Sequence, residues 1–137
     1  MRLYAFSLIC VVLLLHHLKL YDYIFFNIIE FDMIMHFSGG FALALIYYSY
    51  FKNEFRGYSK AKFAFFALLA AIGTTSLNEI IEYFGYYFLG SGQGLLYYGA
   101  GDFGAYADTA WDLVCNTLGA FTAVFLMAVS GKMRPKK

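Results

Sequence analysis

The sequence predicts an all-α integral membrane protein, a four-transmembrane-helix bundle that forms a single membrane domain over residues 1–137. Hydrophobic residues make up 61% of the chain and aromatic residues 22%, which is too apolar for a soluble domain. The apolar residues fall into four runs of about the length that crosses a bilayer. The single proline, Pro135, follows the last run, so no helix interior contains one.

The first span is expected over about residues 4–20. An apolar run this close to the N-terminus also resembles the core of a signal peptide. However, no cleavage site of small residues follows it, and His16-His17-Leu18-Lys19 comes instead, which suits a retained anchor. The aromatic-rich stretch 21–31 then predicts an interfacial connection.

The second span is expected over about residues 32–51. Asp32 and His36 are one helical turn apart and therefore point the same way. Small residues follow at Ser38, Gly39 and Gly40. We expect the glycines to let the backbone of the next span, residues 63–88, approach closely. A hydrophilic hairpin over 52–62 separates the two spans.

The third span, about residues 63–88, contains two carboxylates three residues apart, Glu79 and Glu82. Four of its residues share one helical face: Thr75, Glu79, Glu82 and Tyr86. A charge at mid-membrane costs at least about 3 kcal/mol, so such acids usually face a protein interior and are presumed functional. The acids therefore mark the expected site.

The last part of the chain is expected to hold a glycine-rich extracytoplasmic loop over 89–110 and a fourth span over about 111–129. The loop lacks the ending of a phosphate-binding loop, so we interpret it as a compact lid or a re-entrant loop over the site. At the start of the span, Asp108, Asp112 and Asn116 are spaced by four and share one face.

Charge distribution predicts the orientation. Basic residues gather at the N-terminus, in the 52–62 hairpin and in the tail 132–137, which the positive-inside rule places in the cytoplasm. Both termini are then cytoplasmic, in the cytoplasmic (inner) membrane of a prokaryote. All of the nine acidic residues except Glu54 lie on the outer side, where Lys19 is the one Lys or Arg. Carboxylates so collected repel one another unless a metal ion, protons or a cationic substrate joins them.

The residue types at this site are those of a metal centre. Four residues are candidate metal ligands: Asp32, His36, Glu82 and Asp112. Imidazole with carboxylates suits Zn, Mn or Fe, whereas an all-oxygen subset suits Mg or Ca, so the identity of a divalent metal cofactor stays open. No His-Glu-x-x-His or Glu-x-x-His motif accompanies them.

Catalytic and structural roles are both open for these acids. In an enzyme, Glu79, Glu82 and Asp112 would be the catalytic residues, one of them acting as general base for a metal-bound water. The candidates for substrate binding are Asn116, Asp108, Trp111 and Tyr83. In the alternative, the acids form buried hydrogen bonds that only hold the helices together.

Three motifs in this order resemble a known family. They are Phe31-Asp32-Met33-Ile34-Met35-His36-Phe37-x-x-Gly40-Phe41, Asn78-Glu79-Ile80-Ile81-Glu82-Tyr83, and Gly101-Asp102 with Asp108-Thr109-x-Trp111-Asp112-x-x-x-Asn116-x-x-Gly119-Ala120. Over about residues 31–125, the chain is similar to the YjdF-type bacterial inner-membrane proteins of unknown function. Tyr83 stands where those proteins usually have tryptophan. More distantly, the chain resembles the VanZ-like proteins, which are linked to teicoplanin resistance.

The resemblance implies a small polytopic membrane protein and names no reaction. We expect action on a lipid or envelope component at the outer face, and the alternative is a non-catalytic accessory or binding subunit of the membrane. Transport ranks third, because acids confined to one half mark no path to the cytoplasmic side. The expected partners are membrane lipids, with other membrane subunits or a second copy left open. Nucleic acid is excluded because the few basic residues lie at segment ends.

Overall fold

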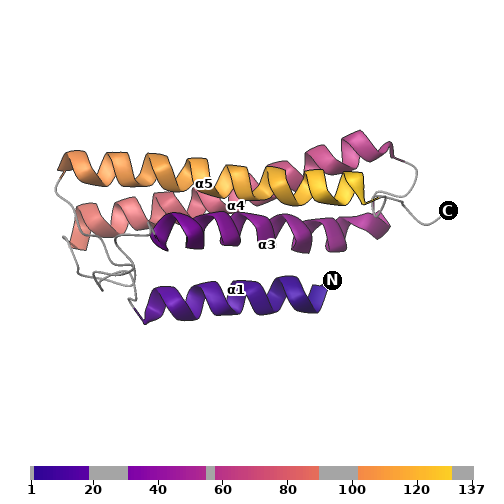
Figure 1. Ribbon diagram of the computed structural model, residues 1–137. Helices are drawn as coiled ribbons and strands as arrows, with labels where there is room; N and C mark the ends of the chain where they lie inside the picture. Colours follow the sequence, from indigo (N-terminus) through magenta and orange to yellow (C-terminus); the bar gives the residue numbers. More distant parts are fainter. Residues whose placement is uncertain (1, 19–30, 55–57, 90–101, 131–137) are drawn as a thin grey trace.

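The described part of the chain contains four helices, each antiparallel to the one before it in the sequence (Figure 1). The computed structural model describes residues 2–18, 31–54, 58–89 and 102–130. The helices are α1 (Arg2–His17), α3 (Phe31–Glu54), α4 (Lys60–Leu89) and α5 (Asp102–Val129). They lie lengthwise beside one another as an elongated bundle (Figure 1). The predicted all-α class is confirmed.

The last helix starts earlier than expected. A loop was predicted over 89–110, but α5 begins at Asp102 and is helical through that segment to Val129. The glycines suggested a loop, yet alanines at 105, 107 and 110 favour a helix. One internal glycine, Gly104, costs only about 1 kcal/mol relative to alanine. Residues 90–101 of the predicted loop and the interfacial connection up to residue 30 lie outside the described residues.

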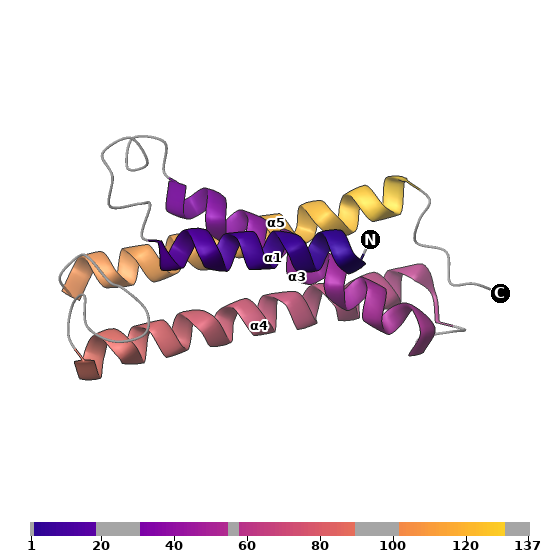
Figure 2. The same cartoon turned by 90° about the horizontal axis from the view of Figure 1, so that it is seen from below.

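Helix α3 is the centre of the bundle. It packs against α1, α4 and α5, and α4 also packs against α5 (Figures 1 and 2). The core between α3, α4 and α5 is built from fully buried alanines: Ala44, Ala71, Ala120 and Ala123. A neighbouring cluster consists of Tyr48, Phe63, Ala67 and Met127. Small side chains at these positions let the three helices lie close together.

Helices α3 and α5 approach each other closely at two glycines. A Cβ atom added at Gly40 would lie 2.7 Å from the carbonyl carbon of Asn116 and 2.9 Å from its Cα. One added at Gly119 would lie 2.9 Å from both the carbonyl carbon of Phe37 and the backbone nitrogen of Phe41. The prediction that Gly39 and Gly40 admit the third span was therefore wrong, because the helix that fits against Gly40 is α5. Only glycine leaves room for this contact.

The outer surface of the bundle is apolar, although several polar side chains are buried. Leu77, Phe88 and Phe125 are 61%, 72% and 65% exposed, whereas Glu79 and Asp112 are 1% and 3% exposed. Helices in lipid show this distribution, since hydrocarbon solvates apolar side chains and polar groups must find partners inside. Among the described residues, two stretches are long and apolar enough to cross a membrane, Lys60–Phe84 and Thr109–Val129. A shorter apolar stretch covers Leu3–Leu15 of α1.

Candidate functional site

The imidazole of His36, near the start of α3, lies between two groups of polar side chains. Its Nδ1 atom is 3.1 Å from Nδ2 of Asn116 and 3.3 Å from Oε1 of Glu79. Its Nε2 atom is 3.4 Å from Oδ1 of Asp112 and 3.7 Å from Oδ1 of Asp32. One side chain of α3 therefore contacts polar residues of both α4 and α5.

Backbone packing explains why His36 and Asn116 meet. Asn116 lies where α5 passes closest to α3, because Gly40 has no side chain to hold the helices apart. The Nδ2 group of Asn116 also donates to Oε1 of Glu79 at 3.3 Å. Asn116 thus connects the imidazole of α3 to the carboxylate of α4.

Two acids of this cluster, Glu79 and Asp112, are buried within the apolar stretches. Glu79 lies within Lys60–Phe84, and Asp112 lies within Thr109–Val129. Asp32 is less enclosed, with 38% of its side chain exposed. Ionised groups at such depths need a compensating charge or proton, so the imidazole alone leaves a surplus of carboxylates.

One carboxylate oxygen of Glu79 takes no part in these hydrogen bonds. Oε1 interacts with His36 and Asn116, but Oε2 is buried and has no hydrogen-bond partner among the described residues. A buried acceptor without a partner destabilises the folded state by roughly 1–3 kcal/mol. A proton or a bound cation would supply the missing interaction.

The neutral imidazole has two tautomers. With hydrogen on Nε2, Nδ1 accepts from Asn116 while Nε2 donates to the aspartates. With hydrogen on Nδ1, the ring donates to Glu79, and the lone pair of Nε2 faces Asp32 and Asp112. The second state has the arrangement common in metal sites, in which a carboxylate holds the outer nitrogen of a ligating histidine.

Asp32, His36 and Asp112 form a group that could hold a metal ion. One ligand atom from each lies within 4.8 Å of the others. Metal–ligand distances of 2.0–2.2 Å around a tetrahedral ion place neighbouring ligand atoms about 3.4 Å apart. The 3.4 and 3.7 Å separations from Nε2 to the two carboxylates are close to that spacing, and all three ligand atoms lie within 4.8 Å of one another.

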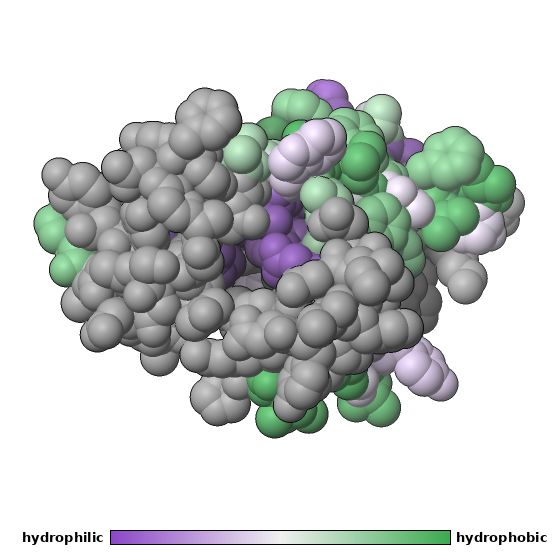
Figure 3. All heavy atoms as spheres, turned by 60° about the vertical axis from the view of Figure 1, so that its left-hand side comes forward, coloured by the Kyte–Doolittle hydropathy of each residue, from purple (hydrophilic) through white to green (hydrophobic). Residues whose placement is uncertain are grey.

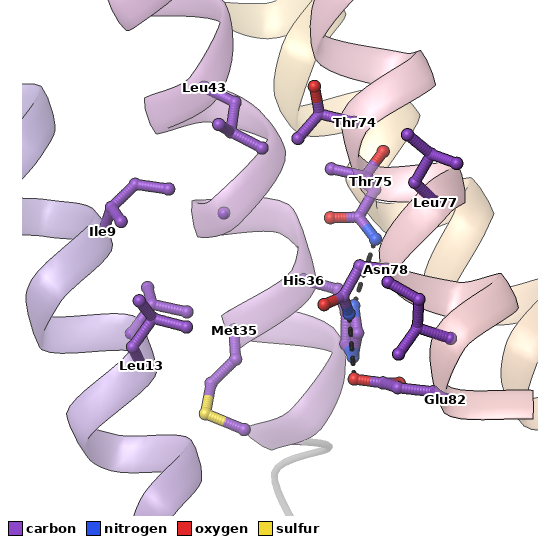
Figure 4. Close-up of a pocket in the computed structure, with 14 residues that line it drawn as sticks. Ile9, Leu13, Met35, His36, Leu43, Thr74, Thr75, Leu77, Asn78 and Glu82 are labelled. Atoms are coloured by element: carbon purple, nitrogen blue, oxygen red, sulfur yellow. Dashed lines mark hydrogen bonds between the residues drawn. The ribbon is translucent and has the colours of Figure 1, made fainter. Parts of the chain in front are cut away.

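Glu82 belongs to a different part of the site. It is buried and lies outside the group of three, and its Oε1 accepts a hydrogen bond of 2.8 Å from Nδ2 of Asn78. Both residues line a cavity of about 430 Å³ between α1, α3 and α4 (Figure 4). Figure 3, which views the molecule toward this end of the bundle, shows hydrophilic residues (purple) there.

Most of the predicted site residues lie together, and some do not. Five meet around the imidazole: Asp32, His36, Glu79, Asp112 and Asn116. Tyr83 is half-buried with its ring against Phe84, and Trp111 is 56% exposed; neither lines the cavity. The side chain of Asp108 lies outside the described residues, as does that of Tyr86, which was predicted to share the acidic face.

Sequence reasoning did not predict that Asn78 or α1 contributes to the site. Asn78 directly precedes Glu79, and its spacing of four from Glu82 indicates the observed hydrogen bond. Ile9, Val12 and Leu13 of α1 line the cavity. Their spacing of three and four residues is helical, but α1 is apolar on all sides, so no face stood out.

Exposed apolar side chains around a buried polar cluster define the class of protein as a helical membrane protein. The chain belongs to the family described as "Predicted membrane protein (DUF2238)", whose model matches residues 1–132. No curated protein matches the chain. No solved structure matches it either.

Proposed function

We propose that this protein crosses the cytoplasmic membrane of a prokaryote four times and binds a divalent metal ion through Asp32, His36 and Asp112. The observation that carries the proposal is the position of the imidazole, with Nε2 between two carboxylates and Nδ1 against a third. The site acts on a lipid or envelope component at the outer face. The YjdF-type and more distant VanZ-like resemblances stay predictions, and the link of VanZ-like proteins to drug resistance is not carried over to this chain.

The distribution of charge supports placing the site near the outer surface. Lys52, Lys60 and Lys62 are exposed at the end of the bundle where α3 ends and α4 begins. The polar cluster lies toward the opposite end, where α3 begins and α4 ends (Figure 1). Lysines next to transmembrane helices favour the cytoplasmic side, so both termini are cytoplasmic and the cluster is extracytoplasmic.

This topology predicts the behaviour of reporter fusions. A reporter fused after Arg56 or at Lys137 is expected to lie in the cytoplasm, so only a reporter that works in the cytoplasm should be active there. One inserted near Gly94 is expected to be active only outside the cytoplasm. Paired phosphatase and fluorescent-protein fusions measure both states. Cytoplasmic activity at Gly94 would invert the site and contradict the proposal.

The chemistry that fits the cluster is hydrolysis or transfer at a polarised oxygen. A divalent metal held there would activate water or a substrate oxygen. Glu79 would hold the imidazole through Nδ1, and Asn116 would hold Glu79. Glu82 lines the cavity on the side where a substrate would enter and is the candidate general base.

A second function is favoured by one observation. The amide nitrogen of Asn116 lies within hydrogen-bond distance of both His36 and Glu79, so several polar groups of the cluster already have partners within the protein. The same contacts would suit a non-catalytic accessory subunit in which the cluster joins three helices. The two functions differ in whether the cluster binds metal.

Metal analysis of purified protein tests the proposal. Wild type purified without chelators is expected to contain about one divalent metal ion per chain, measured by elemental mass spectrometry. His36→Gln keeps a polar side chain of similar size but removes the ligating imidazole, so its metal content should fall to background. Glu54→Gln removes an acid at the other end of the bundle and serves as the control. If wild type contains no metal, or if His36→Gln contains as much metal as wild type, the metal site is contradicted and the structural function is favoured.

A further inference from the structure

Thr109, near the start of α5, carries a buried hydroxyl group that the cluster around His36 does not use. Its Oγ1 atom is buried and has no hydrogen-bond partner among the described residues. An unpaired hydroxyl in the interior destabilises a folded protein, because the group has given up its bonds to water. Such a group therefore calls for an explanation, and a role in ligand binding or catalysis is one.

Other threonines of the bundle avoid this cost within their own helix. The hydroxyl of Thr74 donates to the carbonyl of Ala70 at 2.9 Å, and that of Thr122 donates to the carbonyl of Leu118 at 2.8 Å. A bond to the carbonyl one turn earlier is the usual solution for a threonine inside a helix. Thr109 has a full helical turn before it in α5 but makes no such bond. Its hydroxyl is therefore available to a different partner.

The position of Thr109 places this hydroxyl beside the proposed metal ligands. Thr109 is three residues before Asp112 and seven before Asn116, so the three residues share one face of α5. Asp112 and Asn116 are buried on that face, and both contact the imidazole of His36. Because α5 begins at the outer end of the bundle, Thr109 lies one turn outward of Asp112.

The proposed metal site is least enclosed on the same outer side. Asp32 lies in the first turn of α3 and has 38% of its side chain exposed, whereas Asp112 is buried. Asp32, His36 and Asp112 supply one ligand atom each. A metal ion with three protein ligands takes a water as its fourth ligand at catalytic sites. The open side of this site is the place for that water.

A hydroxyl suits a metal-bound water better than another carboxylate would. The hydrogens of the water need acceptors, and the oxygen of a hydroxyl group accepts without adding negative charge. Carboxylates already outnumber the cationic groups of the cluster, so a neutral acceptor adds no further repulsion. The unpaired oxygen of Thr109 meets this requirement.

We propose that the hydroxyl of Thr109 accepts a hydrogen bond from the water that completes the coordination of a metal ion at Asp32, His36 and Asp112. The bond fixes the orientation of the water, and therefore the direction in which its lone pair faces a substrate. Thr109 is thus a positioning residue, which acts through the water and does not bind the metal itself. This inference rests on the proposed function and adds a residue to the same site.

Thr109→Val tests the inference, because valine has the shape of threonine but lacks the hydroxyl. The full chain is purified in detergent without metal, and its melting temperature is measured. The variant is expected to melt at or above wild type, since the change removes an unpaired polar atom from the interior. Titration with Mn²⁺ or Zn²⁺ alone should then show binding weaker by roughly tenfold, about 1.4 kcal/mol, because the metal-bound water has lost its acceptor.

Two further variants make the result specific. Thr109→Ser keeps the hydroxyl and should bind the metal like wild type. Thr122→Val makes the same chemical change farther along α5, where the hydroxyl donates to Leu118, and should leave metal affinity unchanged. A purely structural hydroxyl at Thr109 would behave in the opposite way, since its loss would lower the melting temperature and leave metal affinity intact.

Three results would overturn the inference: Thr109→Val that melts well below wild type or does not fold, equal metal affinity in Thr109→Val and wild type, or an equal loss of affinity in Thr109→Ser. Wild type measured in the same titrations separates the two proposals. If wild type binds metal and Thr109→Val binds it equally well, the role of Thr109 is contradicted and the metal site stands. If wild type binds no metal, both proposals are contradicted.

Discussion

Gly40→Leu is expected to prevent the helices from assembling around the site. Any side chain at this position overlaps the backbone of α5 at Asn116, and backbone atoms cannot turn aside as a flexible side chain can. Overpacking a core typically costs 1–3 kcal/mol, and we expect about 3 kcal/mol or more here because two whole helices must separate. The separation would also pull Asn116 away from His36, now 3.1 Å apart.

Melting in detergent and size-exclusion chromatography measure this effect. Gly73→Leu adds the same side chain to α4, where the position is open, and should melt close to wild type. Gly119→Leu should behave like Gly40→Leu, because its side chain would overlap the carbonyl of Phe37 on the same crossing. A Gly40→Leu protein that melts like Gly73→Leu would show that α3 and α5 do not pack this closely.

Asp112→Asn is expected to abolish metal binding while leaving the protein folded. The amide has the size of the carboxylate but lacks the charge that, with Asp32, attracts a cation to Nε2 of His36. Without metal, the variant should be at least as stable as wild type, since repulsion between the two acids is relieved. If Asp112 only joins helices, metal plays no part and the change leaves cellular activity intact.

The response of stability to added metal distinguishes these outcomes. A ligand at a hundredfold excess over its dissociation constant stabilises the folded state by about 2.7 kcal/mol. Wild type and the control Glu54→Gln should therefore melt higher as Mn²⁺ or Zn²⁺ is added to metal-free protein, and Asp112→Asn should not. An equal rise in Asp112→Asn would contradict its assignment as a ligand.

Sequence reasoning located much of the candidate site because helical spacing determines which side chains share a face. Asp32 and His36, and likewise Asp112 and Asn116, are one turn apart and lie together in the structure. Alternation of helices along the chain brings the start of α3, the end of α4 and the start of α5 to one end of the bundle (Figure 2). Spacing could not show that His36 would contact Glu79 and Asp112 through different nitrogens.

The sequence by itself determined the helical class, the membrane character and the collection of acids toward one end, since these follow from composition and from periodicity within single segments. Tertiary structure decided which faces meet. Gly40 packs on α5 and not on α4, Glu82 turns to Asn78, and α1 forms one wall of the cavity. The physical reason is that membrane helices are apolar on most sides, so hydrophobicity does not select a neighbour. The choice depends on the fit of small residues against a particular backbone and on hydrogen bonds that form only when three helices are assembled.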